Sequence, residues 1–404
     1  MRIVFVASSS VQSFGGDGMV ARELSEVLSS ENEVLLVLSG MKMNQTKKTE
    51  NFTFLEVSGK KKGDFVLPLL NPVKIQAIFK SLKKFSPDIV HLHDQGPVPF
   101  VVLLWSLKNK VPVIFTCHTI PSEVVSFGLA ELLPKMQVLF DSKIFDSYFD
   151  IFLKKSSAIV AINDSVLRDL SNFRLETPVY KISNGRHLSL YSNVSFADQS
   201  IFPKRLLYIG YLNKRKNQNY LLDVMKHLPK EEFVLDLIGV PLKDSYGKEL
   251  EEKARSQDLS VQFLGKIPHE EIPGYLSRAH FFVSASLLEV QSLSILEALA
   301  SGTPVISLDN ETTSEFIDES VGYNFETSTP PEEFAAKTQD FARLSTADYE
   351  KKCENAREKV EDMDWSNIAI QTLEMYKEVT LSKDETRRKL NGLKKLFKYI
   401  DMSG

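Results

Sequence analysis

The chain has 404 residues, 43% of them hydrophobic and 25% charged, and a net charge of −4 at pH 7. This composition excludes an intrinsically disordered or fibrous protein, and the lack of a basic excess argues against binding of nucleic acid. The length exceeds the ~250–300 residues at which single hydrophobic cores stop growing, so two domains are expected.

Short apolar runs alternate with helical patterns along the first half of the chain. Runs rich in Val and Ile occupy residues 2–8, 33–40, 88–93, 111–118, 157–163 and 179–185, and a helical pattern covers 19–30. The runs lack the alternation of half-exposed strands, which is typical of parallel strands covered on both faces. The second half repeats this organisation, with strand-like runs at 205–212, 232–239, 260–265, 281–286 and 303–308 and a helix at 220–228.

A polar, pattern-free segment at 191–204 separates the two halves, and we place the linker between domains there. The sequence predicts two Rossmann-like, doubly wound α/β domains with parallel sheets, at 1–195 and 200–369, and a closing helix at about 370–404 that packs back on the first. Ligands bind such sheets outside the carboxyl ends of the strands, so a cleft between the domains is expected. A two-domain dehydrogenase or a periplasmic-type binding protein has the same layout.

The cysteine content and the lengths of the apolar runs bear on the cellular compartment of the protein. The two cysteines, Cys117 and Cys353, lie far apart, so neither a disulfide framework nor a cysteine metal site is expected, and a reducing cytoplasm fits. The N-terminus opens on a strand-like run without the architecture of a signal peptide. No apolar stretch approaches the ~18–20 residues that cross a bilayer. We therefore expect a cytoplasmic protein, soluble or peripheral on the membrane.

The segment 284–307 decides between the classes of protein. A buried strand ends before Glu289, a helix is expected from about Ser292 to Ser301, and Gly302 ends it. The free N–H groups at the start of this helix form a site suited to a diphosphate. Glu289 and Glu297 place a carboxylate on either side of that site, and carboxylates accept strong hydrogen bonds from sugar hydroxyls.

This segment resembles the signature of glycosyltransferase family 4, retaining GT-B enzymes that use nucleotide-diphosphate sugars. The signature is Glu, seven residues, Glu-Ala and then Gly-Thr-Pro-Val, and it stands here as Glu289, Glu297-Ala298 and residues 302–305. The resemblance implies GT-B architecture, a catalytic Glu289 on the transferred sugar and Glu297 on the nucleotide ribose. It also implies that the donor diphosphate is held by backbone amides around Gln291, Ser292 and Leu293. The alternative is an ordinary surface loop, with Ser294 and Glu297 as a capping box.

The segment 208–222 matches the family's basic turn, whose two cations neutralise the donor diphosphate. Gly210, Leu212 and Lys216 fit the pattern of Gly-Arg-Leu followed by Lys-Gly. Tyr211 replaces the arginine, so the resemblance implies that Lys216 binds the donor and that the adjacent Arg215 supplies the second charge. The alternative is a solvated basic turn.

The loop after the first strand carries Gly15 and Gly16, which match the family's glycines near donor and acceptor. The resemblance makes Gly15 and Gly16 an acceptor-side loop and gives Gly16 a contact with the donor. The loop is not a Gly-x-Gly-x-x-Gly fingerprint and no Walker lysine follows it, which argues against a dinucleotide or ATP site.

Three histidines end two of the buried strands. His91 and His93 lie at period two and Asp94 follows them, but no third ligand at metal-like spacing appears, so no metal site is expected. His118 matches a histidine that family members place beside the reacting sugar, and it is the second catalytic candidate. A neutral imidazole there can donate to a sugar or phosphate oxygen. The alternative is a packed structural histidine.

The resemblance as a whole implies a metal-independent, retaining hexosyltransferase that requires no cofactor beyond its co-substrate. The donor is a UDP- or GDP-sugar and the acceptor a hydroxyl group, in synthesis of a glycolipid, a cell-surface polysaccharide or another glycoconjugate. The alternatives are a GT-B-type sugar-nucleotide epimerase and a sugar-nucleotide-binding protein with impaired catalysis. The sequence Asp362-Met363-Asp364 has the metal-binding form of another transferase class, but its charged surroundings indicate a helix surface.

Two basic amphipathic segments suggest contact with an anionic membrane surface. Residues 71–85 place Ile75, Ile78, Phe79 and Leu82 on one helical face beside Lys74, Lys80, Lys83 and Lys84, and residues 383–404 carry a net charge of +4. The alternatives are a core helix with solvated lysines and a closing helix packed on the first domain.

Overall fold

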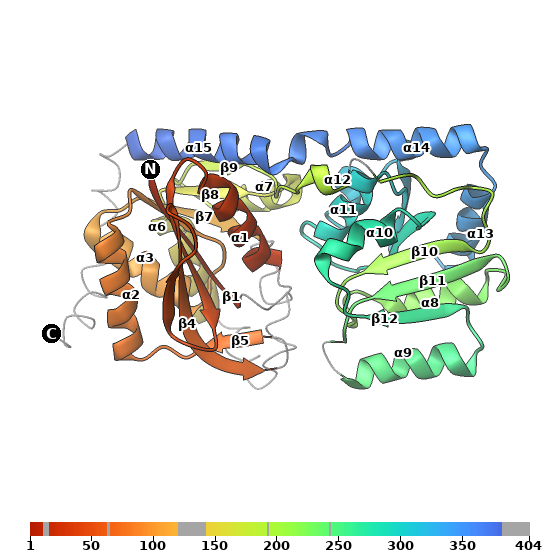
Figure 1. The fold of residues 1–404 in the computed structure, drawn as a ribbon, viewed down its shortest axis with the longest axis horizontal. Helices are drawn as coiled ribbons and strands as arrows, with labels where there is room; N and C mark the ends of the chain where they lie inside the picture. Colours follow the sequence, from red (N-terminus) through yellow and green to blue (C-terminus); the bar gives the residue numbers. More distant parts are fainter. Residues whose placement is uncertain (11–15, 63–64, 120–142, 192–193, 242–243, 382–404) are drawn as a thin grey trace. The chain divides into compact units, whose positions relative to one another are not determined.

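The computed structural model describes residues 1–10, 16–62, 65–119, 143–191, 194–241 and 244–381. The chain divides into two α/β units, residues 1–185 with the segment that begins at Trp365, and Arg186–Asp364 (Figure 1). The structural boundary thus lies at Gly185 and Arg186, ahead of the segment 191–204 in which we expected the linker. Tyr191 and Lys204 are buried, and Tyr191 packs in a core cluster of the second unit, so this polar segment belongs to that unit.

The first unit is built on one sheet with the strand order β3-β4-β2-β1-β6-β7-β8-β9, and β5 pairs with β4. The neighbours are parallel except where β3 and β5 pair with β4. The strands are β1 (Arg2–Ser10), β2 (Glu33–Gly40), β3 (Asn44–Lys47), β4 (Phe52–Lys62), β5 (Phe65–Pro68), β6 (Ile89–Leu92), β7 (Val113–Cys117), β8 (Ala158–Ala161) and β9 (Val179–Lys181).

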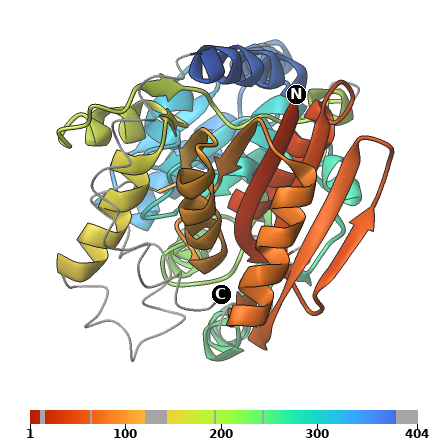
Figure 2. The same ribbon diagram turned by 90° about the vertical axis from the view of Figure 1, so that its left-hand side faces the viewer.

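Helices cover the sheet of the first unit, and Figure 2 shows two of them, α2 and α3, in front of the strands. The helices are α1 (Gly16–Leu28), α2 (Pro72–Phe85), α3 (Pro97–Asn109), α6 (Lys143–Lys155), α7 (Asp164–Leu170) and α15 (Trp365–Leu381). The last of these returns to the first unit and packs on α1, where Trp365 Nε1 donates a 2.9 Å hydrogen bond to Glu23. The expected closing helix thus begins at Trp365, and its part after residue 381 lies outside the described residues.

The second unit has a parallel sheet with the order β12-β11-β10-β13-β14-β15. Successive residues of β10 pack into different core clusters: Leu206 and Tyr208 in one and Leu207 in the other. Both faces of the sheet are therefore covered, as the unbroken apolar runs predict. The strands are β10 (Lys204–Ile209), β11 (Phe233–Ile238), β12 (Val261–Gly265), β13 (Phe281–Ser284), β14 (Val305–Leu308) and β15 (Gly322–Phe325).

The helices of the second unit follow its strands in the regular alternation of an α/β fold. They are α8 (Gln218–Lys226), α9 (Asp244–Ser256), α10 (Ile272–Leu276), α11 (Leu293–Ser301), α12 (Thr313–Phe316), α13 (Pro331–Ala342) and α14 (Thr346–Glu358), with short 3₁₀ turns at Leu188–Leu190, His269–Glu271 and Glu361–Met363. Residues 362–364 do not lie on an α-helix as interpreted, but Asp362 is exposed in the 3₁₀ helix Glu361–Met363. They form the turn after α14, where the Asp364 carboxylate accepts a 3.2 Å hydrogen bond from Leu188 N.

Among the helices that the structure describes, none is long and apolar enough to cross a membrane. In α2 the apolar face is largely covered by the fold, because Ile78 and Leu82 are fully buried, while Lys80, Lys83 and Lys84 are exposed. The helix therefore packs on the first unit through its apolar face and presents these lysines to solvent.

Candidate active site

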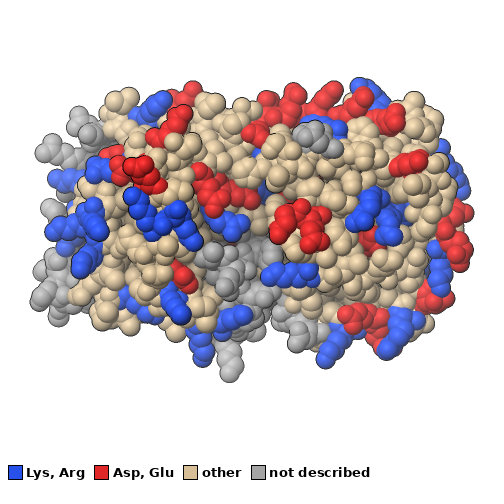
Figure 3. Space-filling view, in the orientation of Figure 1, with Lys and Arg blue, Asp and Glu red and all other residues tan. Residues whose placement is uncertain are grey.

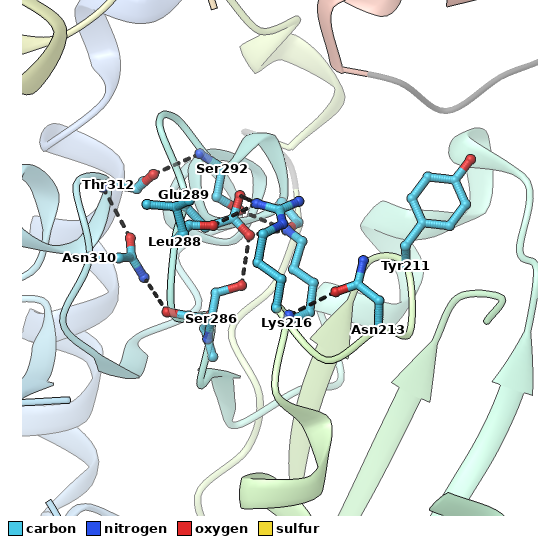
Figure 4. A network of polar contacts seen from close by, with 12 residues as sticks. Tyr211, Asn213, Lys216, Ser286, Leu288, Glu289, Ser292, Asn310 and Thr312 are labelled. Carbon is cyan, nitrogen blue, oxygen red and sulfur yellow. Dashed lines mark hydrogen bonds and ion pairs between the residues drawn. The ribbon is translucent and has the colours of Figure 1, made fainter. Parts of the chain in front are cut away.

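Glu289 lies in the loop between β13 and α11, and its side chain is 10% exposed. Oε1 forms an ion pair with Lys216 Nζ and accepts a 2.7 Å hydrogen bond from Ser286 Oγ, and Oε2 is 3.9 Å from the Arg215 guanidinium (Figure 4). Burial by itself would raise the pKa of Glu289, but the two cations and the hydrogen bonds outweigh it and hold the pKa below its usual value. The carboxylate is thus kept ionised within a largely buried cluster.

The basic turn comes close to Glu289 because β10 and β13 are neighbours in the sheet and end at the same edge. The two loops are also joined directly. The Arg215 guanidinium donates a 2.6 Å hydrogen bond to Leu288 O, and Leu287 N donates to Arg215 O at 2.9 Å. Burial is the largest influence on Lys216 and lowers its pKa, and Glu289 opposes that shift.

The side chain of Tyr211 points away from the Glu289 cluster (Figure 4). Its backbone carbonyl accepts a 2.9 Å hydrogen bond from Gln218 Nε2, which fixes the start of the turn. Arg215 therefore supplies the second positive charge at this carboxylate, and the side chain of Tyr211 does not contact it.

The first turn of α11 lies directly beyond the Glu289 loop. Ser292 is the N-cap, and its N–H donates a 2.8 Å hydrogen bond to Thr312 Oγ1. The first i→i−4 bond of the helix runs from Leu296 N to Ser292 O, so the N–H groups of Leu293, Ser294 and Ile295 precede the regular helical bonds. Of the amides that the resemblance implied for the diphosphate, that of Ser292 already has a protein acceptor.

Glu297 projects from α11 and is also largely buried, with a side chain that is 5% exposed. Its Oε1 lies 3.5 Å from Arg186 Nε and 3.0 Å from His269 Nε2. The helix has its N-cap at Ser292 and shows no side-chain cap hydrogen bond. The capping box of Ser294 and Glu297, which the sequence left as an alternative, is therefore not formed.

Sequence reasoning missed Arg186 and His269. Arg186 directly follows a strand-like run and the Ser-Asn-Gly of residues 183–185, so an ionisable residue at a strand's carboxyl end was the available signal. His269 carried no comparable signal, because it lies in a short turn 28 residues before its partner.

The first unit holds three histidines: His91 lies within β6, His93 directly follows β6, and His118 directly follows β7. His91 is bonded to Tyr376 Oη and to Thr116 Oγ1, each at 2.6 Å, and His93 Nδ1 is bonded to His118 Nε2 at 3.1 Å. Burial lowers the pKa of His91 to about 3 and that of His118 to about 4, and it holds that of His93 well below its usual value. All three imidazoles are therefore neutral at neutral pH.

A small cavity of about 20 Å³ lies beside these histidines and is lined in part by His91, His93, Thr116 and Asn184. His93 Nε2 is buried and has no hydrogen-bond partner among the described residues. The volume suffices for one water molecule, which would satisfy that nitrogen.

The remaining predicted residues fall as follows. Gly16 is exposed at the start of α1, whereas Gly15 lies outside the described residues. His118 belongs to the first unit and Glu289 to the second. Within the described part of the chain, no group of three or more His, Cys, Asp or Glu side chains is placed to hold a metal ion.

Two family models match adjacent parts of the chain. The model described as Glycosyl transferases group 1 matches residues 198–361, and that described as Glycosyltransferase Family 4 matches residues 14–190. The chain belongs to glycosyltransferase family 4. The resemblance found in the sequence is thereby confirmed.

Curated relatives in this family share part of their length with the chain. An alpha-monoglucosyldiacylglycerol synthase of Streptococcus pneumoniae is 26% identical over 241 residues, 56% of this chain and 53% of the relative. Sulfoquinovosyl transferase SQD2 of Arabidopsis thaliana is 23% identical over 237 residues, 57% of this chain and 44% of the relative. The matched part of the chain thus spans about half the length of these relatives.

Solved structures match nearly the whole chain. A sucrose-phosphate synthase from Thermosynechococcus elongatus has a TM-score of 0.74 at 18% identity and covers 95% of this chain and 100% of its own. Anabaena HepE in complex with UDP-glucose has a TM-score of 0.73 at 17% identity and covers 94% and 100%. These likenesses confirm the prediction of a GT-B fold with two parallel-sheet α/β domains.

Proposed function

We propose that the protein is a retaining glycosyltransferase that moves a hexose from a nucleotide-diphosphate sugar, a UDP- or GDP-hexose, to a hydroxyl acceptor. The observation that carries the proposal is the buried Glu289 carboxylate, kept ionised by Lys216 and Arg215 beside the first turn of α11. An ionised carboxylate accepts hydrogen bonds from sugar hydroxyls, and the two cations and the helix start attract a diphosphate.

In this proposal the donor lies along the carboxyl edge of the second unit's sheet. Lys216, Arg215 and the amides of Leu293 and Ser294 meet the negative charge that develops on the leaving diphosphate, and they are in place before the reaction. Glu289 holds the hexose and Glu297 the ribose. The leaving phosphate assists removal of the acceptor's proton on the same face of the sugar, so no protein nucleophile and no metal ion are used.

His118 is the proposed contribution of the first unit. Because its imidazole is neutral and Nε2 is engaged by His93, Nδ1 is the atom left to meet a sugar or phosphate oxygen. The second unit thus serves as the donor-binding domain and the first as the acceptor-binding domain, with Gly15 and Gly16 in the acceptor-side loop.

The relatives favour particular substrates. HepE was solved with UDP-glucose, and two curated relatives are named as synthases of a glucosyl diacylglycerol. A UDP-hexose donor and a lipid hydroxyl acceptor are therefore the first pair to test. A lipid acceptor also agrees with a peripheral position on the cytoplasmic face of a membrane, where the lysines of α2 would meet anionic lipids.

The test is transfer by the purified chain from a panel of UDP- and GDP-hexoses, with diacylglycerol in detergent micelles and polysaccharide fragments as acceptors. We expect transfer with retention of anomeric configuration, and a loss of about 10²–10³-fold in Glu289→Gln, because a group that binds the reacting sugar is removed. The control is Glu354→Gln, an exposed glutamate on α14 of the same unit.

Other outcomes have distinct meanings. Interconversion of donor sugars without transfer would indicate an epimerase, and donor binding without turnover would indicate a binding protein with impaired catalysis. Either result, or full turnover in a folded Glu289→Gln variant, would overturn the proposal. Equal melting temperatures of the variants would show that the loss is not a loss of fold.

A further inference from the structure

We propose that Arg186 is a positioning residue that fixes Glu297 so that one carboxylate oxygen is presented to the ribose hydroxyls of the donor. This inference rests on the proposed function, because it takes a nucleotide-diphosphate sugar as the ligand. It assigns a role to a residue outside the family signature and to the contact that it makes with α11.

The geometry leaves the two oxygens of Glu297 in different environments. Arg186 Nε and His269 Nε2 both approach Oε1, at 3.5 Å and 3.0 Å, and neither contact involves Oε2. The ion pair and the hydrogen bond on Oε1 restrict rotation of the carboxylate. Oε2 is then the acceptor that remains for a ligand.

Burial makes the counterion necessary. The side chains of Glu297 and Arg186 are 5% and 2% exposed, so each charge is nearly removed from water. A buried charge is tolerated only when it is paired, and removal of one partner leaves the other uncompensated. Arg186 thus supplies the counterion for a carboxylate that α11 carries inside the fold.

The backbone of Arg186 is held as firmly as its side chain. Its N–H donates a 2.8 Å hydrogen bond to Met363 O, and Arg186 forms a parallel bridge with Asp364. These residues lie at the two points where the chain passes between the units, 185–186 and 364–365. The side chain therefore projects toward Glu297 from a fixed base, which favours a defined position of Oε1.

Ribose presents two neighbouring hydroxyls, and a fixed carboxylate oxygen accepts from one or both. A nucleotide that lacks the 2′-hydroxyl should lose this contact, and the loss should depend on how well Glu297 is oriented. Discrimination between a ribonucleotide and its 2′-deoxy counterpart is therefore a property that Arg186 controls and that overall stability does not.

The experiment measures binding of UDP, GDP and their 2′-deoxy counterparts to the full chain by isothermal titration calorimetry. We expect the wild-type protein to favour the ribonucleotide by about tenfold, as a hydrogen bond to a charged group implies. In Arg186→Gln we expect this ratio to approach one, through weaker binding of the ribonucleotide and little change for the deoxynucleotide.

Two further variants make the result decisive. The matched control is Arg357→Gln, since Arg357 is a second arginine of the same unit that bonds to the carbonyls of Val194 and Ser301 and should leave the ratio unchanged. Arg186→Lys keeps the charge but not the position of Nε. It should retain a reduced ratio, and it replaces Arg186→Gln if the latter does not fold.

The outcomes separate this inference from the proposed function. Absence of UDP and GDP binding in the wild-type protein would overturn the proposed function. Binding with equal affinity for ribo- and deoxynucleotides, or an unchanged ratio in both Arg186 variants, would overturn the role of Arg186 and leave the donor site in place.

Discussion

Lys216 matches the basic turn of the family pattern, whereas position 211 of the same turn does not. The arginine expected at position 211 is a tyrosine whose side chain points away from the Glu289 cluster. The charge at the Glu289 carboxylate therefore depends on Lys216 and on Arg215, which is 3.9 Å away. In the proposed function, Lys216 would therefore meet the larger part of the diphosphate's charge, because it is the closer of the two cations to Glu289.

We predict that Lys216→Ala lowers kcat with the best donor by about 10²-fold, because a preorganised cation at the leaving group is lost. Lys214→Ala is the matched control, since Lys214 is exposed in the same turn, two residues earlier. Steady-state kinetics and the melting temperature of both variants provide the measurement. Equal losses in the two variants would show that only the general positive charge of the turn matters.

The site residues that the sequence predicted lie close together in the chain, whereas those it missed lie far from the residue that they contact. Glu289 and Glu297 share one short loop and helix, so their spacing reveals their relation. Arg186 lies 111 residues from Glu297 and His269 lies 28 residues from it, and only the folded sheet brings them to its Oε1. Local spacing carries no information on such pairs.

For helix α2, the periodicity of apolar residues predicts a helix but not what its apolar face contacts. Its pattern of apolar residues and lysines is the same for a membrane-surface helix and for a core helix, and the structure buries Ile78 and Leu82 against the fold. Yet Val73 at its start is 73% exposed and Leu69 before it is 56% exposed. Lys and Arg side chains gather on the part of the first unit that carries α2 (Figure 3).

We predict that the lysines of α2 support binding to anionic vesicles. Replacement of Lys80, Lys83 and Lys84 by Glu should weaken partition into vesicles of phosphatidylglycerol and phosphatidylcholine by roughly 100-fold, since each lysine near such a surface contributes ~1 kcal/mol. Co-sedimentation measures this. The same change at Lys230, Lys248 and Lys351 of the second unit is the control, and equal effects of the two triple variants would contradict a role for α2.

The strands at the β3 edge of the first unit's sheet were also not predicted from the sequence. Strands β3, β4 and β5 at residues 44–68 were not predicted: β3 is polar, β4 alternates apolar and polar residues before it ends in three lysines, and β5 has only four residues. β3 and β5 pair only with β4 among the described strands, and the residues of β3 are mostly exposed. A strand without two covered faces does not need an apolar run.

At the scale of the whole molecule, composition, strand runs and one signature sufficed to predict a GT-B fold, because parallel strands covered on both faces are easily recognised. The boundary between the units was harder to place. It depends on Arg186, a buried charged residue that forms a bridge with Asp364. The sequence placed Arg186 within the first domain, at 1–195, and only its partners in the folded chain assign it to the second unit.

The histidines of the first unit make stability depend on pH. Burial holds the folded pKa values of His91 and His118 at about 3 and about 4 and that of His93 well below 6.5, so unfolding lets these side chains take up protons. Their contribution is fully present above pH 6.5 and is lost as the pH falls. Asp94 acts in the opposite direction, because burial and Asp17 raise its pKa to about 7 and folding therefore takes up a proton there.

We predict that the free energy of unfolding falls between pH 6 and pH 5, because the histidines outnumber Asp94, and that each histidine contributes about 1.4 kcal/mol per pH unit. His91→Asn should therefore reduce the slope by about that amount. His227→Asn should leave the slope unchanged, because His227 is exposed on the second unit. Urea denaturation across this pH range provides the measurement. Equal slopes in the wild type and His91→Asn would contradict the neutral, buried state of this imidazole.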